Sequence, residues 1–427
     1  MCLFLVRANY MIGRQVCRFV EYNEKKEKVR MYILKPSFYD KFTCIGDKCK
    51  MTCCGGWGIG IRLTPEKYQA YLAVDGFISE CAKKAFAYNS DKGTYNVIFD
   101  ERKLCPFCDK EQLCEIVKQL GPDAIGEICA TFPRIQATSG IMDELYLSLG
   151  CPWVVELLME TEDVLSFEVQ EDANELEAFE DEVAYQLVLR DWKIRDRILD
   201  FLQNREIDFS FRQFYAEYCL EKIKGYQDMQ PLSKMESVLD ELLLADNYLA
   251  LSENLSSANR NNFHSVQYGI YKDALLMFDD CIRQLACRDK DNTYQKFEEL
   301  LSRNQSIGFH EWNMAYSSWM SQSERSFSIL SEKILSYDWM IFALYGSDKY
   351  YMLHNYLKIL IRNILVKQFH ILYFSLHGEI PDSMSYIIVA MVSRSVDHGS
   401  KYINQLLSKW EKDGILDTAY MYILLQN

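Results

Sequence analysis

Proline, glycine, positive charge and long apolar runs are all scarce in this chain of 427 residues. With only 8 prolines, 19 glycines and 49% hydrophobic residues, the composition is that of a globular protein. No stretch of about 18 uncharged apolar residues occurs, so the sequence predicts no membrane span. The first residues lack the basic segment and the long apolar core of a secretory signal. We therefore expect a cytoplasmic protein.

Basic residues are outnumbered by acidic ones, 47 Lys and Arg against 61 Asp and Glu, which gives a net charge of −14. Proteins that bind nucleic acids need Lys and Arg at the phosphates. The charge balance therefore argues against a nucleic-acid partner. The length exceeds that of one ordinary domain and predicts two or three. A chain of this size buries a large core unaided, so its 15 cysteines are not needed as disulfide staples.

Cysteine is abundant, and its thiols gather in the first part of the chain. Four lie within eleven residues in the spacing C-x4-C-x3-C-C: Cys44, Cys49, Cys53 and Cys54. Five more follow: Cys105, Cys108, Cys114, Cys129 and Cys151. Clustered thiols in a reducing compartment are typical of metal ligands rather than of disulfides. The sequence therefore predicts a metal centre.

The spacing favours an iron–sulfur cluster over a single zinc ion. Structural zinc sites usually combine two CxxC turns, whereas this chain has one, from Cys105 to Cys108. Cys53 and Cys54 are adjacent and can hardly both reach one metal, so either one points elsewhere or two metal centres exist. A four-iron cluster is larger than a single ion and accepts thiolates from distant loops more readily. A plain structural zinc site is the weaker alternative.

Signatures of other cofactors are absent. No GxGxxG follows a predicted strand, and the three-cysteine CxxxCxxC signature of radical S-adenosylmethionine enzymes does not occur. The glycine-rich residues 55–60 are interpreted as tight turns that bring the backbone near the sulfurs. The six histidines lie in the second half without metal-binding spacing. Six cysteines are interpreted as packing residues: Cys2, Cys17, Cys81, Cys219, Cys281 and Cys287.

The N-terminal half divides into three parts. Residues 1–30 lack periodicity and are either a gene-model extension, with Met31 as the true start, or an N-terminal arm. Residues 31–155 form the cysteine-rich module, in which a Thr64 cap followed by Pro65 predicts a helix to about residue 73. A short strand is expected at 95–99. Residues 156–182 are strongly acidic and are interpreted as the junction, either a solvated charged face or a surface that attracts a lysine-bearing substrate.

Residues 183–427 show helical periodicity. Apolar residues recur at three and four positions over 264–287 and again over about 348–374. Shorter helices are expected at 183–203, 210–225, 231–248, 291–303, 325–346, 383–395 and 399–412. The predicted fold is mainly α, with a cysteine-rich, loop-heavy N-terminal metal module followed by an all-helical C-terminal region.

The cysteine-rich module resembles the CxxCxxCC zinc- or iron-chelating domain and, within that group, the flagellin lysine-N-methylase family. The resemblance covers residues 31–155 well, whereas the helical half agrees only in length and character. It rests on Cys53-Cys54-x-Gly56-Trp57, Thr64, Tyr68, Cys105-Pro106-Phe107, Leu113-Cys114-x-Ile116, Cys129-x-x-Phe132-Pro133-Arg134 and Glu144-x-x-Leu147-x-Leu149-x-Cys151-Pro152. Tyr146 and Gly150 depart from the family, which has serines at these positions.

The resemblance implies a protein-lysine N-methyltransferase that acts on flagellin, uses S-adenosyl-L-methionine and carries an iron–sulfur cluster, expected to be 4Fe–4S. The family's cysteines correspond to Cys44, Cys49, Cys53, Cys54, Cys105, Cys114, Cys129 and Cys151. Cys108 stands where the family usually has an apolar residue, so the resemblance leaves it out as a ligand.

The sequence identifies no catalytic residue. Methyl transfer to an amine needs a neutral lysine, a held methyl donor and exclusion of water. Arg134 is a candidate for contacting a cofactor carboxylate or a cluster sulfur, or it caps a helix end. The alternative to an enzyme is a non-catalytic metal-chelating or redox-sensing module whose helical domain binds a partner.

Overall fold

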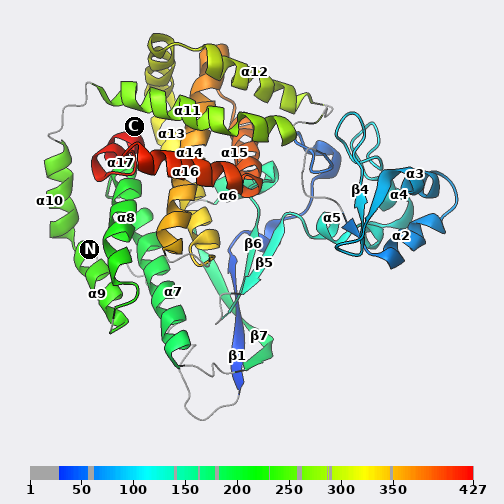
Figure 1. Ribbon diagram of the computed structural model, residues 1–427, viewed down its shortest axis with the longest axis horizontal. Helices are drawn as coiled ribbons and strands as arrows, with labels where there is room; N and C mark the ends of the chain where they lie inside the picture. The colour runs from blue at the N-terminus through cyan, green and yellow to red at the C-terminus, as the bar shows by residue number, and fades with distance from the viewer. Residues whose placement is uncertain are drawn as a thin grey trace.

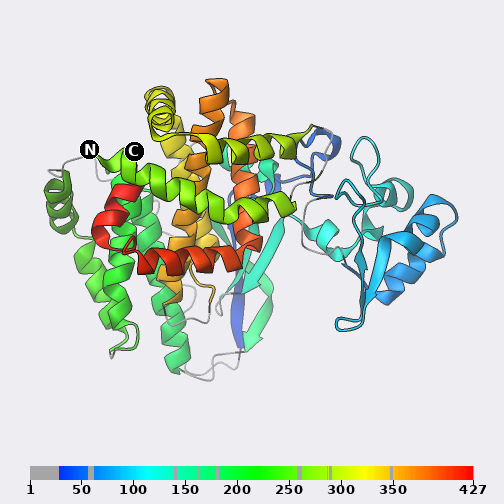
Figure 2. The same ribbon diagram turned by 45° about the horizontal axis from the view of Figure 1, so that its top comes forward.

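The computed structural model describes most of the chain and shows two lobes of unequal size. In Figures 1 and 2 the small lobe projects from one side of a large helical lobe. Residues 1–27, with Cys2 and Cys17, lie outside the described part, and so does most of the glycine-rich stretch. The described residues are 28–55, 62–138, 142–161, 164–177, 182–229, 231–256, 262–285, 287, 291–346 and 350–426.

A four-stranded sheet, in the order β5-β6-β1-β7, lies against the helical lobe. β1 (Lys28–Pro36) runs parallel to β6 (Asp143–Leu147) and antiparallel to β7 (Phe167–Glu177), while β5 (Arg134–Thr138) is antiparallel to β6. Tyr32 and Leu34 alternate along β1 and are buried in the core that the sheet shares with the helices. Parallel strands need a long crossover, and the crossover from β1 to β6 contains the small lobe.

The small lobe, residues 62–131, has a hydrophobic core of its own around Ile78, Ala82 and Phe107. The predicted helix after Thr64 is confirmed, because the Thr64 hydroxyl accepts a hydrogen bond from Lys67 N at 3.3 Å. The expected strand at 95–99 is found one residue early, as β4. The lobe contains β2 (Arg62–Leu63), α2 (Pro65–Leu72), α3 (Phe77–Ala85), β3 (Phe86–Asn89), β4 (Thr94–Val97), α4 (Glu115–Leu120) and α5 (Glu127–Thr131).

From residue 182 to the last described residue the chain is helical, so the predicted fold class is confirmed for the described residues. The helices of this lobe are α6 (Pro152–Met159), α7 (Glu182–Leu202), α8 (Phe209–Ile223), α9 (Ser233–Leu242), α10 (Ala245–Ser256), α11 (Phe263–Leu285), α12 (Thr293–Ser306), α13 (Phe309–Phe342), α14 (Tyr351–His377), α15 (Asp382–His398), α16 (Ser400–Lys412) and α17 (Thr418–Leu425). Short 3-10 turns are η1 (Tyr39–Lys41), η2 (Gly46–Lys48), η3 (Pro122–Ala124) and η4 (Lys224–Tyr226).

Three expected elements differ from the structure. The helix expected at 231–248 is two helices, α9 and α10, and α17 was not expected at all. α13 begins well before the expected residue 325. The serines in its first half obscure the apolar periodicity in the sequence. Trp312, Tyr316 and Trp319 nevertheless recur at helical spacing and are buried. The acidic stretch 156–182 contains the end of α6 and the strand β7, so its central described part, residues 167–177, belongs to the sheet.

One helix in the described part of the chain, α14, is long and apolar enough to cross a membrane. Of its most apolar window, 83% is buried inside the protein, and the helix runs through the middle of the large lobe (Figures 1 and 2). Arg362, halfway along it, forms an ion pair with Asp338 of α13 at 2.6 Å. This burial and this ion pair are what a core helix shows.

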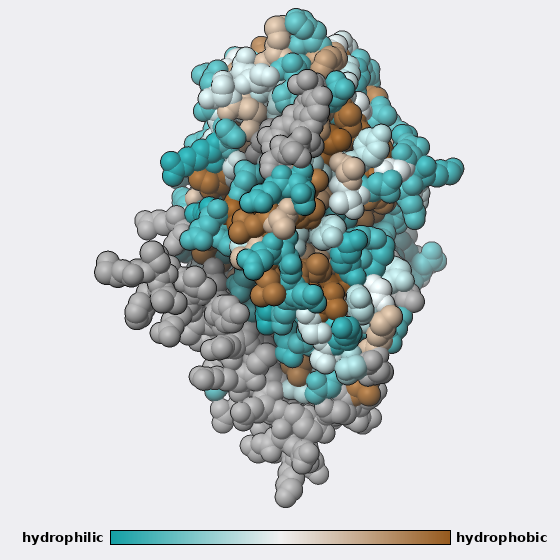
Figure 3. Space-filling model, turned by 90° about the vertical axis from the view of Figure 1, so that its left-hand side faces the viewer, coloured by the Kyte–Doolittle hydropathy of each residue, from teal (hydrophilic) through white to brown (hydrophobic). Residues whose placement is uncertain are grey.

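The face of the large lobe that carries α9 and α10 has a mixed surface. In Figure 3 hydrophobic side chains are interspersed among hydrophilic ones on the coloured part of this face. Leu244, just before α10, and Leu249, within it, are 59% and 50% exposed. Single exposed hydrophobic residues are normal on a protein surface and define no site by themselves.

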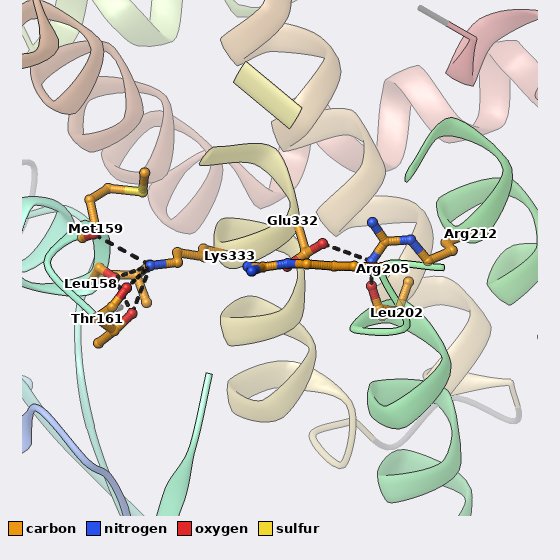
Figure 4. A network of polar contacts seen from close by, with 8 residues as sticks. All are labelled: Leu158, Met159, Thr161, Leu202, Arg205, Arg212, Glu332 and Lys333. Atoms are coloured by element: carbon orange, nitrogen blue, oxygen red, sulfur yellow. Dashed lines mark hydrogen bonds and ion pairs between the residues drawn. The ribbon is translucent and has the colours of Figure 1, made fainter. Parts of the chain in front are cut away.

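Two neighbouring charged residues of α13, Glu332 and Lys333, connect α8 with the C-terminal end of α6 (Figure 4). Glu332 accepts hydrogen bonds from Arg212 at 2.7 Å and from Arg205 at 2.8 Å. Lys333 donates in the opposite direction, to the carbonyls of Leu158 and Met159 at 3.3 and 3.4 Å and to the Thr161 hydroxyl at 2.8 Å. Its ammonium thereby satisfies carbonyls that the C-terminal end of α6 leaves unpaired.

We expect Glu332→Gln to lower the free energy of unfolding by about 3 kcal/mol, because the buried Arg212 guanidinium loses its counter-charge. Urea unfolding followed by circular dichroism measures the change. Glu206→Gln, an exposed acid next to Arg205 in the chain, serves as the control and should stay within about 0.5 kcal/mol of the parent. Equal stability of the two variants would show that the Glu332 pairs contribute nothing.

Candidate metal centre

The predicted ligand cysteines come from the loop that leads into the small lobe, from the small lobe itself and from the start of α6. The loop that carries Cys44 to Cys54 follows β1, runs along the large lobe and leads into the small lobe. Cys151 is the N-cap of α6 in the large lobe. The remaining thiols come from the small lobe, where Cys105 and Cys108 are buried and Cys114 caps the start of α4. The fold thus brings together residues that are about a hundred positions apart.

A buried arginine that the sequence analysis did not single out holds the loop in place. Arg394, on α15, is 1% exposed. Its guanidinium donates to the carbonyl of Thr52 at 3.0 Å and to that of Gly150 at 2.8 Å. It also contacts the Met51 carbonyl at 3.4 Å and the Tyr294 hydroxyl at 2.8 Å. Arg394 therefore fixes the backbone beside Cys53 and beside Cys151 at the same time.

Cys44, Cys49, Cys53 and Cys151 form one group of neighbouring thiols. Burial raises the pKa of Cys49, and the nearby thiols of Cys53 and Cys44 add to this, while Arg394 opposes it. Burial also raises the pKa of Cys151 to about 12, with contributions from Cys49 and Cys53. These four thiols therefore lie within electrostatic range of one another, on the loop that Arg394 holds and at the start of α6.

Cys129 connects this group to the thiols of the small lobe. Its pKa is raised to about 12 by burial, by Cys53 on one side and by Cys114 on the other. Cys105 likewise has a pKa of about 12, raised by burial and by Cys114 and Cys129. Each of the eight predicted cysteines thus lies within electrostatic range of at least one other, and their role as ligands stays a prediction.

Cys108, which the family resemblance left out, belongs to the same set. The pKa of Cys54 is raised well above its ordinary value, and its hydrogen bond with the Cys108 thiol is the largest cause. The only sequence signal for Cys108 was the CxxC spacing with Cys105. The thiol of Cys287, interpreted as a packing residue, is buried close to Gly55, where an added Cβ would lie 3.0 Å from its sulfur.

The donor type of this set suits a thiophilic metal, whereas the described side chains do not stand in the geometry of a metal site. Within the described ranges, no three His, Cys, Asp or Glu side chains already stand in metal-binding geometry. The donors are all sulfur, the ligand type of iron–sulfur clusters, zinc and copper(I). Neighbouring thiols stay protonated because their thiolates would repel one another, and a bound cation removes that repulsion. The residues thus fit a thiolate-bound metal by donor type.

Arg134, the predicted cofactor contact, lies at the start of the cysteine loop, whereas most of the glycine-rich stretch is outside the described residues. Arg134 begins β5, where its guanidinium donates to the Phe42 carbonyl at 3.3 Å and lies over the Phe42 ring at 5.2 Å. It therefore fastens the start of the cysteine loop to the sheet, and its expected contact with a cofactor stays a prediction. Residues 56–61, which include Trp57, lie outside the described residues.

Comparison with known proteins defines the class of this thiol-rich, helical protein. The sequence model of the FliB lysine N-methylase C-terminal domain matches residues 195–424, more than half of the chain. The chain belongs to the FliB lysine N-methylase family. No solved structure matches it.

Individual relatives match over a shorter span. The chain is 30% identical over 141 residues to the Lysine-N-methylase of Salmonella typhimurium, a match that covers 31% of this chain and 34% of that protein. The Lysine-N-methylase of Salmonella choleraesuis gives the same identity and coverage. The Flagellar biosynthetic protein FliU of Salmonella muenchen is also 30% identical over 141 residues, and the match covers 80% of its length. The match thus spans about a third of the two lysine-N-methylases.

We expect Arg394→Lys to lower the free energy of unfolding by about 3 kcal/mol, because one ammonium cannot reach all the acceptors of the guanidinium fork. The same variant should make Cys49 and Cys151 react faster with an alkylating reagent. Tyr294→Phe, which removes one partner of Arg394, is the matched control and should cost about 1 kcal/mol. Urea unfolding and mass spectrometry of the alkylated peptides provide the two measurements. Equal stability and thiol reactivity in both variants would contradict the role given to Arg394.

Proposed function

We propose that this protein transfers a methyl group from S-adenosyl-L-methionine to lysine side chains of flagellin and carries an iron–sulfur cluster at the lobe junction. The proposal rests on the family membership over residues 195–424. The names of the relatives supply the two parts of the activity, lysine N-methylation and flagellar biosynthesis. The match covers about a third of the two lysine-N-methylases, and we infer their activity for this chain from it.

The observation that carries the cluster is the gathering of thiols from both lobes around the loop held by Arg394. Cys44, Cys49 and Cys53 belong to that loop, Cys151 lies beside it at the start of α6, and these four thiols would hold the iron. When bound, a cluster would supply a rigid inorganic core that ties the loop to α6. Arg394 would compensate part of the negative charge that four thiolates bring.

The transfer itself is a polar displacement that needs no radical. The lysine nitrogen, in its neutral form, attacks the methyl carbon of the sulfonium, and the carbon–sulfur bond breaks as the carbon–nitrogen bond forms. The product amine then loses a proton, and S-adenosylhomocysteine leaves. The protein's contribution is to hold the two reactants in line and to keep water away. A location in the cytoplasm, where the donor is made, agrees with this proposal.

The methyl-transfer activity can be tested directly. We expect the anaerobically purified protein, incubated with methyl-labelled S-adenosylmethionine and flagellin, to place label in flagellin lysines. Amino-acid analysis of the labelled flagellin identifies the modified residue type. Flagellin whose lysines have been acetylated beforehand is the control and should take up no label, because an amide nitrogen does not attack the methyl donor. An absence of label in lysine, in protein with an intact cluster, favours the non-catalytic metal-chelating or redox-sensing module instead.

The ligand assignment can be tested without any activity. We expect Cys49→Ala and Cys151→Ala each to lower the iron content of the purified protein by more than half, because each removes one corner of the thiolate set. Cys219→Ala, a fully buried thiol of α8 in the large lobe, is the matched control and should leave iron unchanged. Inductively coupled plasma mass spectrometry gives iron per chain. Full iron in both loop variants would refute the assignment.

A further inference from the structure

Cys108 and Cys114 face each other across two antiparallel segments of the small lobe. The backbone hydrogen bonds that flank the pair are Asp109 N to the Leu113 carbonyl at 2.9 Å and Glu115 N to the Phe107 carbonyl at 2.8 Å. These bonds lie on either side of the two cysteines, which therefore occupy a non-hydrogen-bonded position of the ladder. Side chains directly opposite each other lie on the same face of a ladder. The backbone thus brings the two thiols together.

The spacing at such a position suits a disulfide. Facing residues there have both their Cα and their Cβ atoms about 4.5 Å apart. A disulfide needs Cα atoms about 4.4–6.8 Å apart and Cβ atoms about 3.5–4.5 Å apart. Cys54 and Cys105 also face each other, but Cys105 N donates to the Cys54 carbonyl at 2.7 Å. Theirs is a hydrogen-bonded position, where the Cβ atoms are about 5.5 Å apart. Of these two facing pairs, Cys108 and Cys114 are the better placed.

A tight turn between the two cysteines holds them in register. The Asp109 carboxylate accepts a hydrogen bond from Leu113 N at 2.8 Å, and Gln112 N donates to the Asp109 carbonyl at 3.2 Å. Gln112 has a φ of 62°, in the left-handed region that reverses the chain here. Asp109 also forms an ion pair with Lys118 of α4. Because the folded turn already places the thiols, closing a bond between them costs little further order.

We propose that Cys108 and Cys114 form a reversible redox pair, which an external small-molecule disulfide converts into an intramolecular disulfide. Cys114 is half-buried and Cys108 is 6% exposed, so the external disulfide meets Cys114 first. The Cys114 thiolate attacks one of its sulfurs, forms a mixed disulfide and expels a thiolate. The Cys108 thiolate then attacks the Cys114 sulfur and expels the second thiolate. The two protons of the protein thiols pass to the expelled thiolates. The proposal does not depend on the methylase activity.

The disulfide would cross-link the core of the small lobe. Phe107 precedes Cys108, Ile116 follows Cys114 by two residues, and both side chains are buried in that core. A core below about 70–80 residues seldom stabilises a fold without a disulfide or a metal, so the oxidised lobe is the more stable one. Both cysteines are free thiols in the structure. Disulfides of cytosolic proteins are usually transient and redox-sensing, and a pair that opens and closes is of that kind.

The first experiment equilibrates the purified protein with mixtures of reduced and oxidised glutathione, alkylates the remaining thiols and maps the cysteines by mass spectrometry without reduction. Trypsin cuts after Lys110 and so separates the pair into peptides 104–110 and 111–118. In oxidising mixtures we expect these two peptides to be linked, with Cys105 alkylated, and excess reduced glutathione should break the link. Linkage through Cys105 or Cys54 instead, or no linkage in any mixture, would overturn the proposal.

Two matched variants locate the bond. Cys108→Ser should lose the link between the two peptides, whereas Cys105→Ser, which removes the other thiol of the same tryptic peptide, should keep it. The opposite pattern would show that Cys105 is the partner of Cys114 and would refute the assignment. Because the readout is a peptide linkage, failure of the methyl-transfer assay leaves this test unaffected.

The second experiment uses the unaltered chain, so that a failure of Cys108→Ser to fold does not decide the outcome. The glutathione equilibration is repeated in concentrated urea. We expect the ratio of linked to unlinked peptide at one glutathione mixture to fall about tenfold, because the unfolded chain no longer holds the two thiols together. Equal ratios in native buffer and in urea would show that the fold does not favour the bond and would contradict the proposal.

Discussion

The fork of hydrogen bonds around Arg394 is the constraint on which the arrangement of the thiols depends. A buried guanidinium must find acceptors for its N–H groups, because an unpaired buried charge costs several kcal/mol. Arg394 finds them on three segments far apart in the sequence, at residues 51–52, 150 and 294. The planar fork has a fixed geometry, so it sets the position of the loop before Cys53 and of the turn before Cys151. The first group of thiols follows from that placement.

The topology brings the second group of thiols to the same place. The parallel strands β1 and β6 require a crossover, and this chain uses the crossover to carry a lobe with its own core. The loop that leaves β1 passes Arg394 before it enters the lobe, and α5 ends just before β5 returns to the sheet. The junction of the lobes therefore carries thiols that come from both. A metal bound there would couple the small lobe to the helical bundle that matches the family.

The sequence predicted the parts of the structure that local pattern determines. The apolar stripes of α11 and α14 and the capped start of α2 were predicted because three- and four-residue spacing and an N-cap are local signals. β7 was hidden because its acidic residues resemble a solvated linker, and only pairing with β1 makes it a strand. Arg394 could be suspected from one charge within the apolar part of α15, but its partners lie far away along the chain. Cys108 joins the thiol set through a backbone bridge that no spacing rule describes.

The central claim is that the thiols at the lobe junction hold an iron–sulfur cluster in a member of the FliB lysine N-methylase family. The most direct measurement is the iron and acid-labile sulfide content of the anaerobically purified parent protein, taken together with its visible spectrum. A brown protein with about four iron and four sulfide per chain and a broad thiolate-to-iron absorption is the predicted result. A colourless protein without sulfide, whose thiols hold only zinc or no metal, would contradict the account.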